Sequence, residues 1–246
     1  FHVSAANFAA LSGLAPSQAV LIWGQVLSAG VGLSVYSLGK TLFKDWKPAL
    51  LAALMVTFAT KMPAYYLSWG RYTLLTGMLL LPLAASAAVQ WLHKDSPKEW
   101  AALILLTAGT LLAHYFTAVL LAIFLVLLAI WHLVQGWRQR DIDWKTLLTL
   151  FAAVMVGLLL ALPWLVRVFQ NTGMTMTPEL VLPEQPNGYF ENKDQWEYVW
   201  QLIGPQSGYV LLGLALPGLI IAFWHPSSRA FATWSLMLML LALPWG

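Results

Sequence analysis

The stretch Trp100–Trp137 contains 38 residues and no formal charge. As one helix it would be about 57 Å long at 1.5 Å per residue, almost twice the roughly 30 Å of a bilayer's hydrocarbon core. The whole chain shares this character. Of its 246 residues 60% are hydrophobic and 9% charged, whereas soluble domains have about 45–50% and about 25%. We therefore expect an all-α, polytopic transmembrane helix bundle. This composition excludes a soluble enzyme, a disordered tail and a nucleic-acid binder.

The positive-inside rule indicates how this stretch is divided. If it is a hairpin that turns near His114 and Tyr115, nine Lys and Arg lie on the inner side of the membrane and four on the outer side. One continuous helix would give seven and six, so the hairpin is favoured. The four outer cations are then Lys61, Arg71, Arg167 and Lys193, and the nine inner ones are Lys40, Lys44, Lys47, Lys94, Lys98, Arg138, Arg140, Lys145 and Arg229.

Further apolar runs, such as Ala15–Gly39, Tyr72–Leu92 and Thr146–Val166, predict the other spans. We expect about seven spans in a single transmembrane domain, residues 1–246, with Phe1 on the outer side. Small residues at helical spacing should let neighbouring helices approach closely. These are Gly24, Ser28 and Gly32 in one run, and Ala84 and Ala88 in another.

The longest loop, residues 167–207, is expected on the outer side and holds five of the ten carboxylates. Within it, four apolar residues at i, i+3, i+4 and i+7 predict an amphipathic helix that lies along the membrane: Trp196, Val199, Trp200 and Ile203. Asp194 and Glu197 fit a capping box at the start of this helix. A loop of this length is often a lid or a binding loop.

The outer segment Lys61–Tyr72 combines two cations with four aromatic side chains. An arginine at a membrane surface can bind a phosphate in bidentate fashion, and Arg71 stands at the start of an apolar run, where it needs a specific partner. The aromatic side chains could stack on a sugar or on the start of a lipid tail. The alternative is an ordinary aromatic belt with snorkelling cations. The aromatic residues are Tyr65, Tyr66, Trp69 and Tyr72.

His114, at the proposed outer turn, could hydrogen-bond a phosphate or exchange protons near neutral pH. Alternatively, it caps the turn by bonding backbone carbonyls. His93 and His225 are expected to be loop residues without a role.

Metal and redox chemistry receive little support from the sequence. The chain has no Cys, which removes thiolate metal sites and disulfides. Asp141-Ile142-Asp143 matches a pattern that binds divalent metals in nucleotide-sugar enzymes, but an N-cap just before a span explains it better. All ten carboxylates lie in predicted loops, which argues against an ion-coupled transporter.

Three short motifs resemble those of bacterial and archaeal GT-C-type integral membrane glycosyltransferases. They are Tyr65-Tyr66-Leu67-Ser68-Trp69-Gly70-Arg71-Tyr72, Leu111-Leu112-Ala113-His114-Tyr115-Phe116-Thr117 and Phe1-His2. The resemblance covers about residues 1–137. It implies a polytopic enzyme that takes a sugar from a polyprenyl-phosphate carrier at the outer face of a prokaryotic cytoplasmic membrane.

This resemblance also implies roles for individual residues. Arg71 is expected to contact the phosphate, with Lys61 and His114 as helpers and Tyr115 orienting one of them. Tyr66, Trp69, Tyr72 and His2 complete the expected substrate site. The general base is expected before Phe1, so the chain reads as an internal fragment that is inactive alone.

The expected partners are membrane lipid and the polyprenyl-phosphate-linked sugar donor, with no nucleic acid. The resemblance leaves a divalent cation open and indicates no other cofactor. A transporter or flippase for a lipid-linked or amphipathic cargo is the alternative function, and a non-catalytic membrane scaffold is the third.

Overall fold

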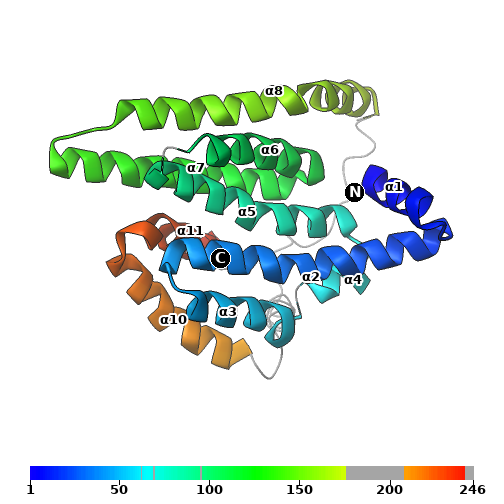
Figure 1. Ribbon diagram of the computed structural model, residues 1–246, viewed down its shortest axis with the longest axis horizontal. Coiled ribbons are helices and arrows are strands. Elements are labelled where there is room, and N and C mark those ends of the chain that lie inside the picture. The colour runs from blue at the N-terminus through cyan, green and yellow to red at the C-terminus, as the bar shows by residue number, and fades with distance from the viewer. Residues whose placement is uncertain (62, 69, 95, 176–207, 242–246) are drawn as a thin grey trace, which may run out of the picture.

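The computed structural model describes residues 1–61, 63–68, 70–94, 96–175 and 208–241, and regular structure in these ranges is helical, as the sequence predicts. Figure 1 shows the arrangement of the helices. In chain order they are α1 (His2–Ser12), α2 (Pro16–Phe43), α3 (Trp46–Leu54), the π-helix η1 (Met55–Ala59), α4 (Ala64–Ser68), α5 (Tyr72–Lys94), α6 (Pro97–Ala113), α7 (Tyr115–Gln139), α8 (Trp144–Thr175), α10 (Gly208–Trp224), the 3₁₀-helix η3 (Pro226–Ser228) and α11 (Arg229–Leu241).

Five segments in the described ranges are long and apolar enough to cross a membrane: Pro16–Phe43, Trp46–Ser68, Tyr72–His93, Tyr115–Gln139 and Trp144–Gln170. The expected number of about seven is not confirmed. Helices α6 and α10 have 17 residues each, the lower limit for crossing a bilayer core. The 13 residues of α11 would extend only about 20 Å.

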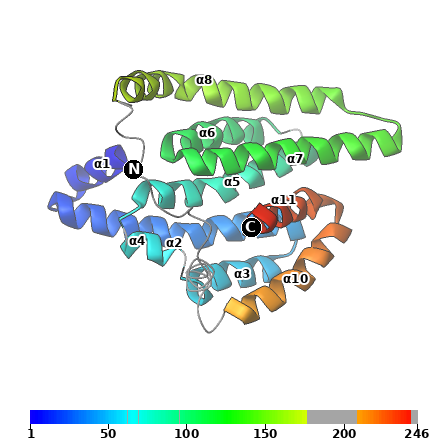
Figure 2. The ribbon, with the colours of Figure 1, turned by 180° about the vertical axis from the view of Figure 1, so that it is seen from behind.

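The uncharged stretch Trp100–Trp137 is divided at the predicted place. Helix α6 ends at Ala113 and α7 begins at Tyr115, with His114 between them in an extended conformation (φ −162°, ψ 130°). The two helices pack against each other and run side by side in Figures 1 and 2. The hairpin inferred from the charge distribution is therefore present.

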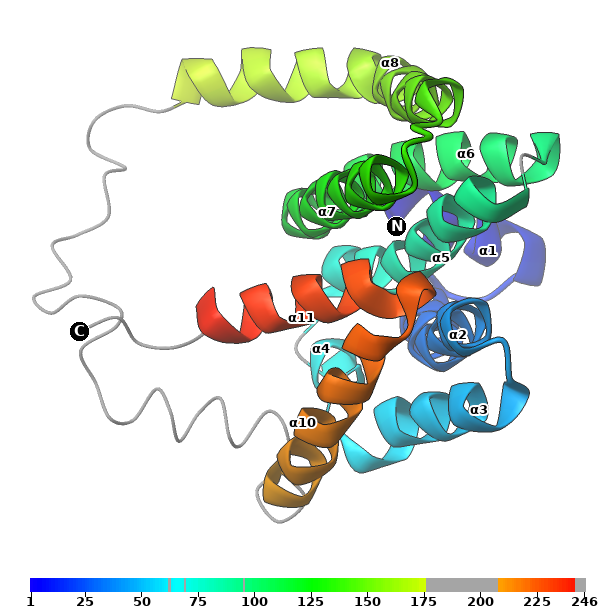
Figure 3. The ribbon, with the colours of Figure 1, turned by 90° about the vertical axis from the view of Figure 1, so that its left-hand side faces the viewer.

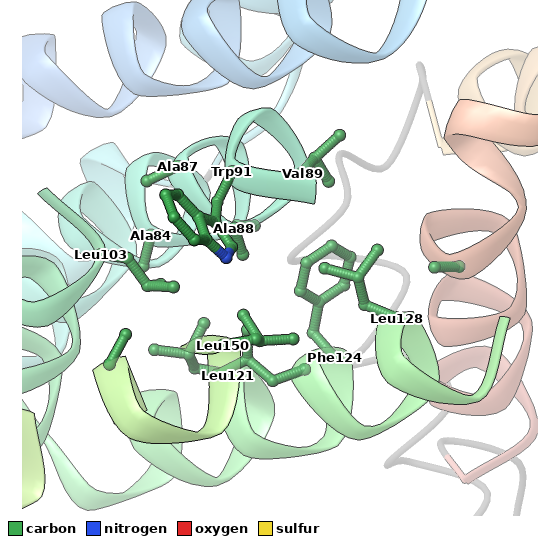
Figure 4. Close-up of a cluster of buried hydrophobic side chains, with 14 of the residues drawn as sticks. Ala84, Ala87, Ala88, Val89, Trp91, Leu103, Leu121, Phe124, Leu128 and Leu150 are labelled. Carbon is green, nitrogen blue, oxygen red and sulfur yellow. The ribbon is translucent and has the colours of Figure 1, made fainter. Parts of the chain in front are cut away.

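Helix α5 forms the centre of the bundle and packs against α2, α6 and α7, as the view along the bundle in Figure 3 shows. Its middle part carries a run of buried alanines beside buried side chains of α6, α7 and α8, drawn in Figure 4. Both Ala84 and Ala88 are fully buried, and Phe124 of α7 is 1% exposed. The small side chains let the neighbouring helices reach α5 closely, as the sequence predicts.

Glycines in α2 let its neighbours approach closely, as the alanines of α5 do. A Cβ atom added at Gly24 would lie 2.5 Å from Cε1 of Tyr72, and one added at Gly32 would collide with Oγ1 of Thr57. Ser28, between them, is half-buried. Gly24 and Gly32 therefore allow close packing by having no side chain.

The bundle has two chemically different ends, which Figures 1 and 2 place on opposite sides of the molecule. At one, which we call the aromatic end, α4 leads into α5 and α6 leads into α7, with α1 nearby. At the other, the cation-rich end, α2 leads into α3, α5 into α6, α7 into α8 and α10 into α11. The segments with the nine predicted inner cations lie at the cation-rich end. There the hydroxyl of Ser227 donates to the backbone carbonyl of Leu42 (3.0 Å) and ties η3 to α2.

The predicted outer loop 167–207 is described only at its beginning. Helix α8 continues through this part as far as Thr175, so residues 167–175 are helical rather than looped. The predicted amphipathic helix with Trp196 and Trp200 lies outside the described residues.

Candidate functional site

Backbone hydrogen bonds fix Arg71 at the aromatic end. Gly70 has φ +69°, a left-handed conformation that favours glycine. Its N–H donates to the carbonyl of Leu67 (3.3 Å), and the N–H of Arg71 donates to the carbonyl of Tyr66 (3.0 Å). This pair of bonds is a Schellman motif that ends α4. It places Arg71 directly before α5, with its side chain exposed.

The next residue, Tyr72, is held from two sides. Its ring stacks on that of Phe1, with centroids 4.8 Å apart and planes 9° apart. On another side it lies against the backbone of Gly24 in α2. The ring of His2 meets Phe1 edge to face at 5.4 Å. The chain start and the beginning of α5, 71 positions apart, thus form one aromatic cluster.

His114 is the N-cap of α7. Its Nδ1 accepts a hydrogen bond from the backbone N–H of Phe116 (3.2 Å), and its ring stacks on that of Tyr115 at 4.7 Å. The capping role is therefore confirmed, but its partner was predicted wrongly: the imidazole accepts from a backbone N–H and does not bond a backbone carbonyl in this cap. An imidazole that accepts at Nδ1 is neutral and carries its proton on Nε2. This nitrogen is then a hydrogen-bond donor that the cap does not use.

The charge of Arg71 affects the pKa of His114, although the two residues are 43 positions apart in the sequence. Burial, and next the positive charge of Arg71, lower the pKa of His114 below its ordinary 6.5. The imidazole is therefore neutral at physiological pH, in agreement with its role as an acceptor in the cap. A guanidinium and a neutral N–H donor at the same end of the bundle are the combination expected around a phosphate group.

The other predicted residues are less closely connected to this pair. Tyr66 is half-buried beside Tyr65, with ring centroids 6.0 Å apart. Lys61 is exposed, and its carbonyl accepts from the N–H of Tyr65. Tyr115 is 77% exposed. Trp69 lies outside the described residues.

Sequence reasoning missed the residues that hold the site without touching a ligand. Gly70 provides the left-handed turn before Arg71, and Gly24 provides the space for Tyr72. The hydroxyl of Thr117 donates to the carbonyl of His114 (2.9 Å) and supports the cap. The glycine in front of an arginine was the available signal for the turn. The contact of Gly24 with Tyr72 has no local signal.

Of the pair Asp141 and Asp143, Asp143 has the structural role that the sequence favoured. Both carboxylate oxygens of Asp143 accept from Thr146: Oδ1 from its N–H (3.0 Å) and Oδ2 from its hydroxyl (2.6 Å). These bonds cap α8 and lower the pKa of the Asp143 carboxyl. Within the described ranges, no group of three or more His, Asp or Glu side chains is arranged to hold a metal ion.

Comparisons with protein-family models, with curated proteins and with solved structures find no match to this chain. The glycosyltransferase resemblance therefore rests on the three motifs, and the function is inferred from the site.

Proposed function

We propose that this chain is part of a GT-C-type glycosyltransferase of a prokaryotic cytoplasmic membrane. It would take a sugar from a polyprenyl-phosphate carrier at the outer face, on the side of the aromatic end. The observation that supports this most directly is that Arg71 and His114, from two of the three motifs of the resemblance, lie at the same end of the bundle, close enough for the charge of Arg71 to lower the pKa of His114.

The chemistry of sugar transfer calls for positive charge beside the phosphate. As the bond between sugar and phosphate breaks, negative charge develops on the leaving polyprenyl phosphate, and a fixed cation stabilises it. Arg71 is the residue proposed for this contact, because a guanidinium matches the geometry of two phosphate oxygens. The Nε2–H of His114 is proposed as a second donor.

The polyprenyl chain and the sugar need apolar and aromatic surface next to the phosphate. Tyr115 and Phe116 are exposed at the start of α7, and Val119 one turn further is 53% exposed. This strip of α7 continues from His114 toward the middle of the bundle, as a lipid tail entering the membrane would. Aromatic faces are suited to stacking on a sugar.

The acceptor hydroxyl needs a general base, and a carboxylate is proposed for this role. In the described ranges the carboxylates of Asp45, Glu99, Asp141 and Asp143 lie in segments at the cation-rich end. The base is therefore proposed either before Phe1, as the resemblance implies, or among the carboxylates of residues 176–207.

Sugar transfer in membranes that contain the full-length protein tests the proposal. With a radiolabelled polyprenyl-phosphate sugar, Arg71→Ala is expected to reduce transfer by roughly 10²–10³-fold, the usual effect of removing one group that stabilises developing charge. Arg138→Ala, at the cation-rich end, is the control and should leave transfer unchanged. Full transfer by Arg71→Ala would contradict the phosphate assignment.

A transporter or flippase is the alternative, and one observation favours it. Thr41 and Ser86 share a hydrogen bond of 2.7 Å between α2 and α5, and the amide nitrogen of Gln90 donates to both hydroxyls at 3.0 Å. A polar cluster between spans could belong to a cargo path. Movement of the lipid-linked sugar across liposomes without any sugar transfer would support this alternative against the enzyme. A scaffold would show neither activity.

A further inference from the structure

A cavity in the described part of the molecule lies at the cation-rich end, away from Arg71 and His114. It has a volume of about 590 Å³ and opens between the last turns of α2 and α5. Its lining includes Tyr36, Lys40, Thr41, Lys44, Gln90 and His93. For His93 the sequence predicted a loop position, which is wrong, because His93 belongs to α5.

The register of two helices brings these side chains together. Tyr36 and Lys40 are four residues apart and therefore occupy one face of α2, and Lys44, the residue directly after the helix, also lines the cavity. Gln90 and His93, three residues apart, occupy one face of α5. Since α2 packs along α5, the two rows face the same space.

Charge in this cavity is one-sided. Among the residues that the structure describes, two lysine ammonium groups and an imidazole line it, with no carboxylate. Among the described residues, neither Lys40 nor Lys44 forms an ion pair with a carboxylate. Lys44 ends α2 in a left-handed conformation, and its N–H donates to the carbonyl of Lys40. Both lysines therefore line the cavity with exposed side chains, which an anion can reach.

Neutral hydrogen-bonding groups complete the lining. The amide nitrogen of Gln90 donates to the hydroxyls of Thr41 and Ser86, as described above. These bonds fix the Gln90 side chain between the two helices. The hydroxyl of Tyr36 is a further donor on the same face of α2 as the lysines. Cations together with hydroxyl groups are the donor set that phosphate oxygens accept from.

The surface beside the cavity is apolar. Leu33 is seven residues before Lys40 on the same face of α2 and is 73% exposed, and Val26, another seven residues earlier, is 50% exposed. An acyl chain can lie along this face while its headgroup occupies the cavity. Basic pockets between transmembrane helices on the cytoplasmic side are typical binding sites for anionic lipid headgroups.

We propose that the cavity between α2 and α5 binds the phosphate headgroup of an anionic phospholipid, with Lys40 and Lys44 as the charged contacts. The hydroxyl of Tyr36 contributes a neutral hydrogen bond, Thr41 and Gln90 form the polar wall behind it, and the exposed face of α2 receives an acyl chain. The site does not depend on the proposed sugar transfer, because it uses other residues at the opposite end of the bundle.

Native mass spectrometry of the detergent-purified chain, titrated with phosphatidylglycerol or phosphatidylcholine, tests this site. The double variant Lys40→Gln/Lys44→Gln should bind phosphatidylglycerol roughly 10–30-fold more weakly than the wild type, because each lysine near anionic lipid contributes about a factor of 3–5. Lys47→Gln/Lys98→Gln is the matched control. It removes the same charge at the same end, from exposed side chains outside the cavity lining, and should bind like the wild type.

Three results would overturn the proposal. Equal losses in both double variants would mean general attraction to a basic surface. Equal wild-type affinities for phosphatidylglycerol and phosphatidylcholine would remove the role of net lipid charge. Inorganic phosphate that competes with phosphatidylglycerol at equal concentration would identify free phosphate, rather than a lipid, as the ligand. Unchanged thermal unfolding of the lipid-free variants controls for misfolding.

Discussion

At the scale of single residues, His114 shows how one side chain can end a helix and still take part in a site. Its extended backbone separates α6 from α7, its Nδ1 caps α7, and its Nε2–H stays available as a donor. The division of tasks depends on the imidazole being neutral. The charge of Arg71 helps to keep it so, because a nearby cation disfavours a second positive charge.

Replacing Arg71 by glutamine should raise the pKa of His114. The pKa should stay below 6.5, because burial is the larger cause of its lowering. Titration of the His114 ring protons by NMR, assigned with His114→Gln, measures the change. Arg138→Gln, at the other end of the bundle, should leave this pKa where it is, and an equal shift in both variants would contradict the contact between Arg71 and His114.

The same pKa gives a sign for the pH dependence of stability. The folded chain disfavours protonation of His114, so the unfolded chain binds more protons as the pH falls below about 6.5. This contribution to stability is present above that pH and is lost progressively below it. Arg71→Gln should make the loss smaller.

At the scale of helices, glycines determine which pairs pack closely. Helix α8 packs against α6 at Gly157, where an added Cβ would lie 2.9 Å from the carbonyl oxygen of Ile104 and 3.0 Å from Cβ of Thr107. The first of these atoms belongs to the backbone and has little freedom to move. Glycine at this position is less favourable for helix formation than alanine would be, but it allows a close contact between the two helices.

We expect Gly157→Ala to destabilise the fold by about 1–3 kcal/mol, the usual cost of overpacking. The loss should exceed the roughly 0.5–1 kcal/mol that alanine contributes within a helix. Gly213→Ala in α10 is the matched control, because no atom lies within 4 Å of the added Cβ. Thermal unfolding midpoints in detergent compare the two variants. An unfolding midpoint for Gly157→Ala at or above that of Gly213→Ala would contradict this prediction. It would show that the backbone of α6 moves to make room for the added Cβ.

At the scale of the whole molecule, the two ends of the bundle differ in charge as the positive-inside rule predicts. The segments joined at the cation-rich end carry nine Lys and Arg, while Lys61, Arg71 and Arg167 belong to the segments at the other end. Since short cytoplasmic loops collect Lys and Arg, the cation-rich end is predicted to face the cytoplasm.

The absence of cysteine from the sequence makes this orientation easy to test. Ser12→Cys in α1 and Lys47→Cys in α3 are exposed positions at opposite ends of the bundle. In intact cells a membrane-impermeant maleimide should label Ser12→Cys, and it should label Lys47→Cys only after the membrane is made permeable. The reverse pattern would invert the predicted orientation and move Arg71 to the inner face.

Much of the architecture could be predicted because hydrophobicity and charge are properties of consecutive residues. The uncharged stretch around His114 is too long for one crossing, and its division at that residue is confirmed. The number of spans was harder to predict. The apolar run Thr146–Val166 shows that this segment prefers lipid, but not that its helix, α8, continues as far as Thr175.

The sequence by itself determined a helical membrane protein with cations concentrated at one end, and it singled out Arg71 and His114 as candidates. Only the tertiary structure decided which side chains meet: Phe1 with Tyr72, Thr41 with Ser86 and Gln90, and Lys40 with His93 around one cavity. These encounters depend on the rotation of each helix about its axis and on how closely its neighbours approach. Both are set by packing between residues far apart in the chain, so they cannot be read from any one segment.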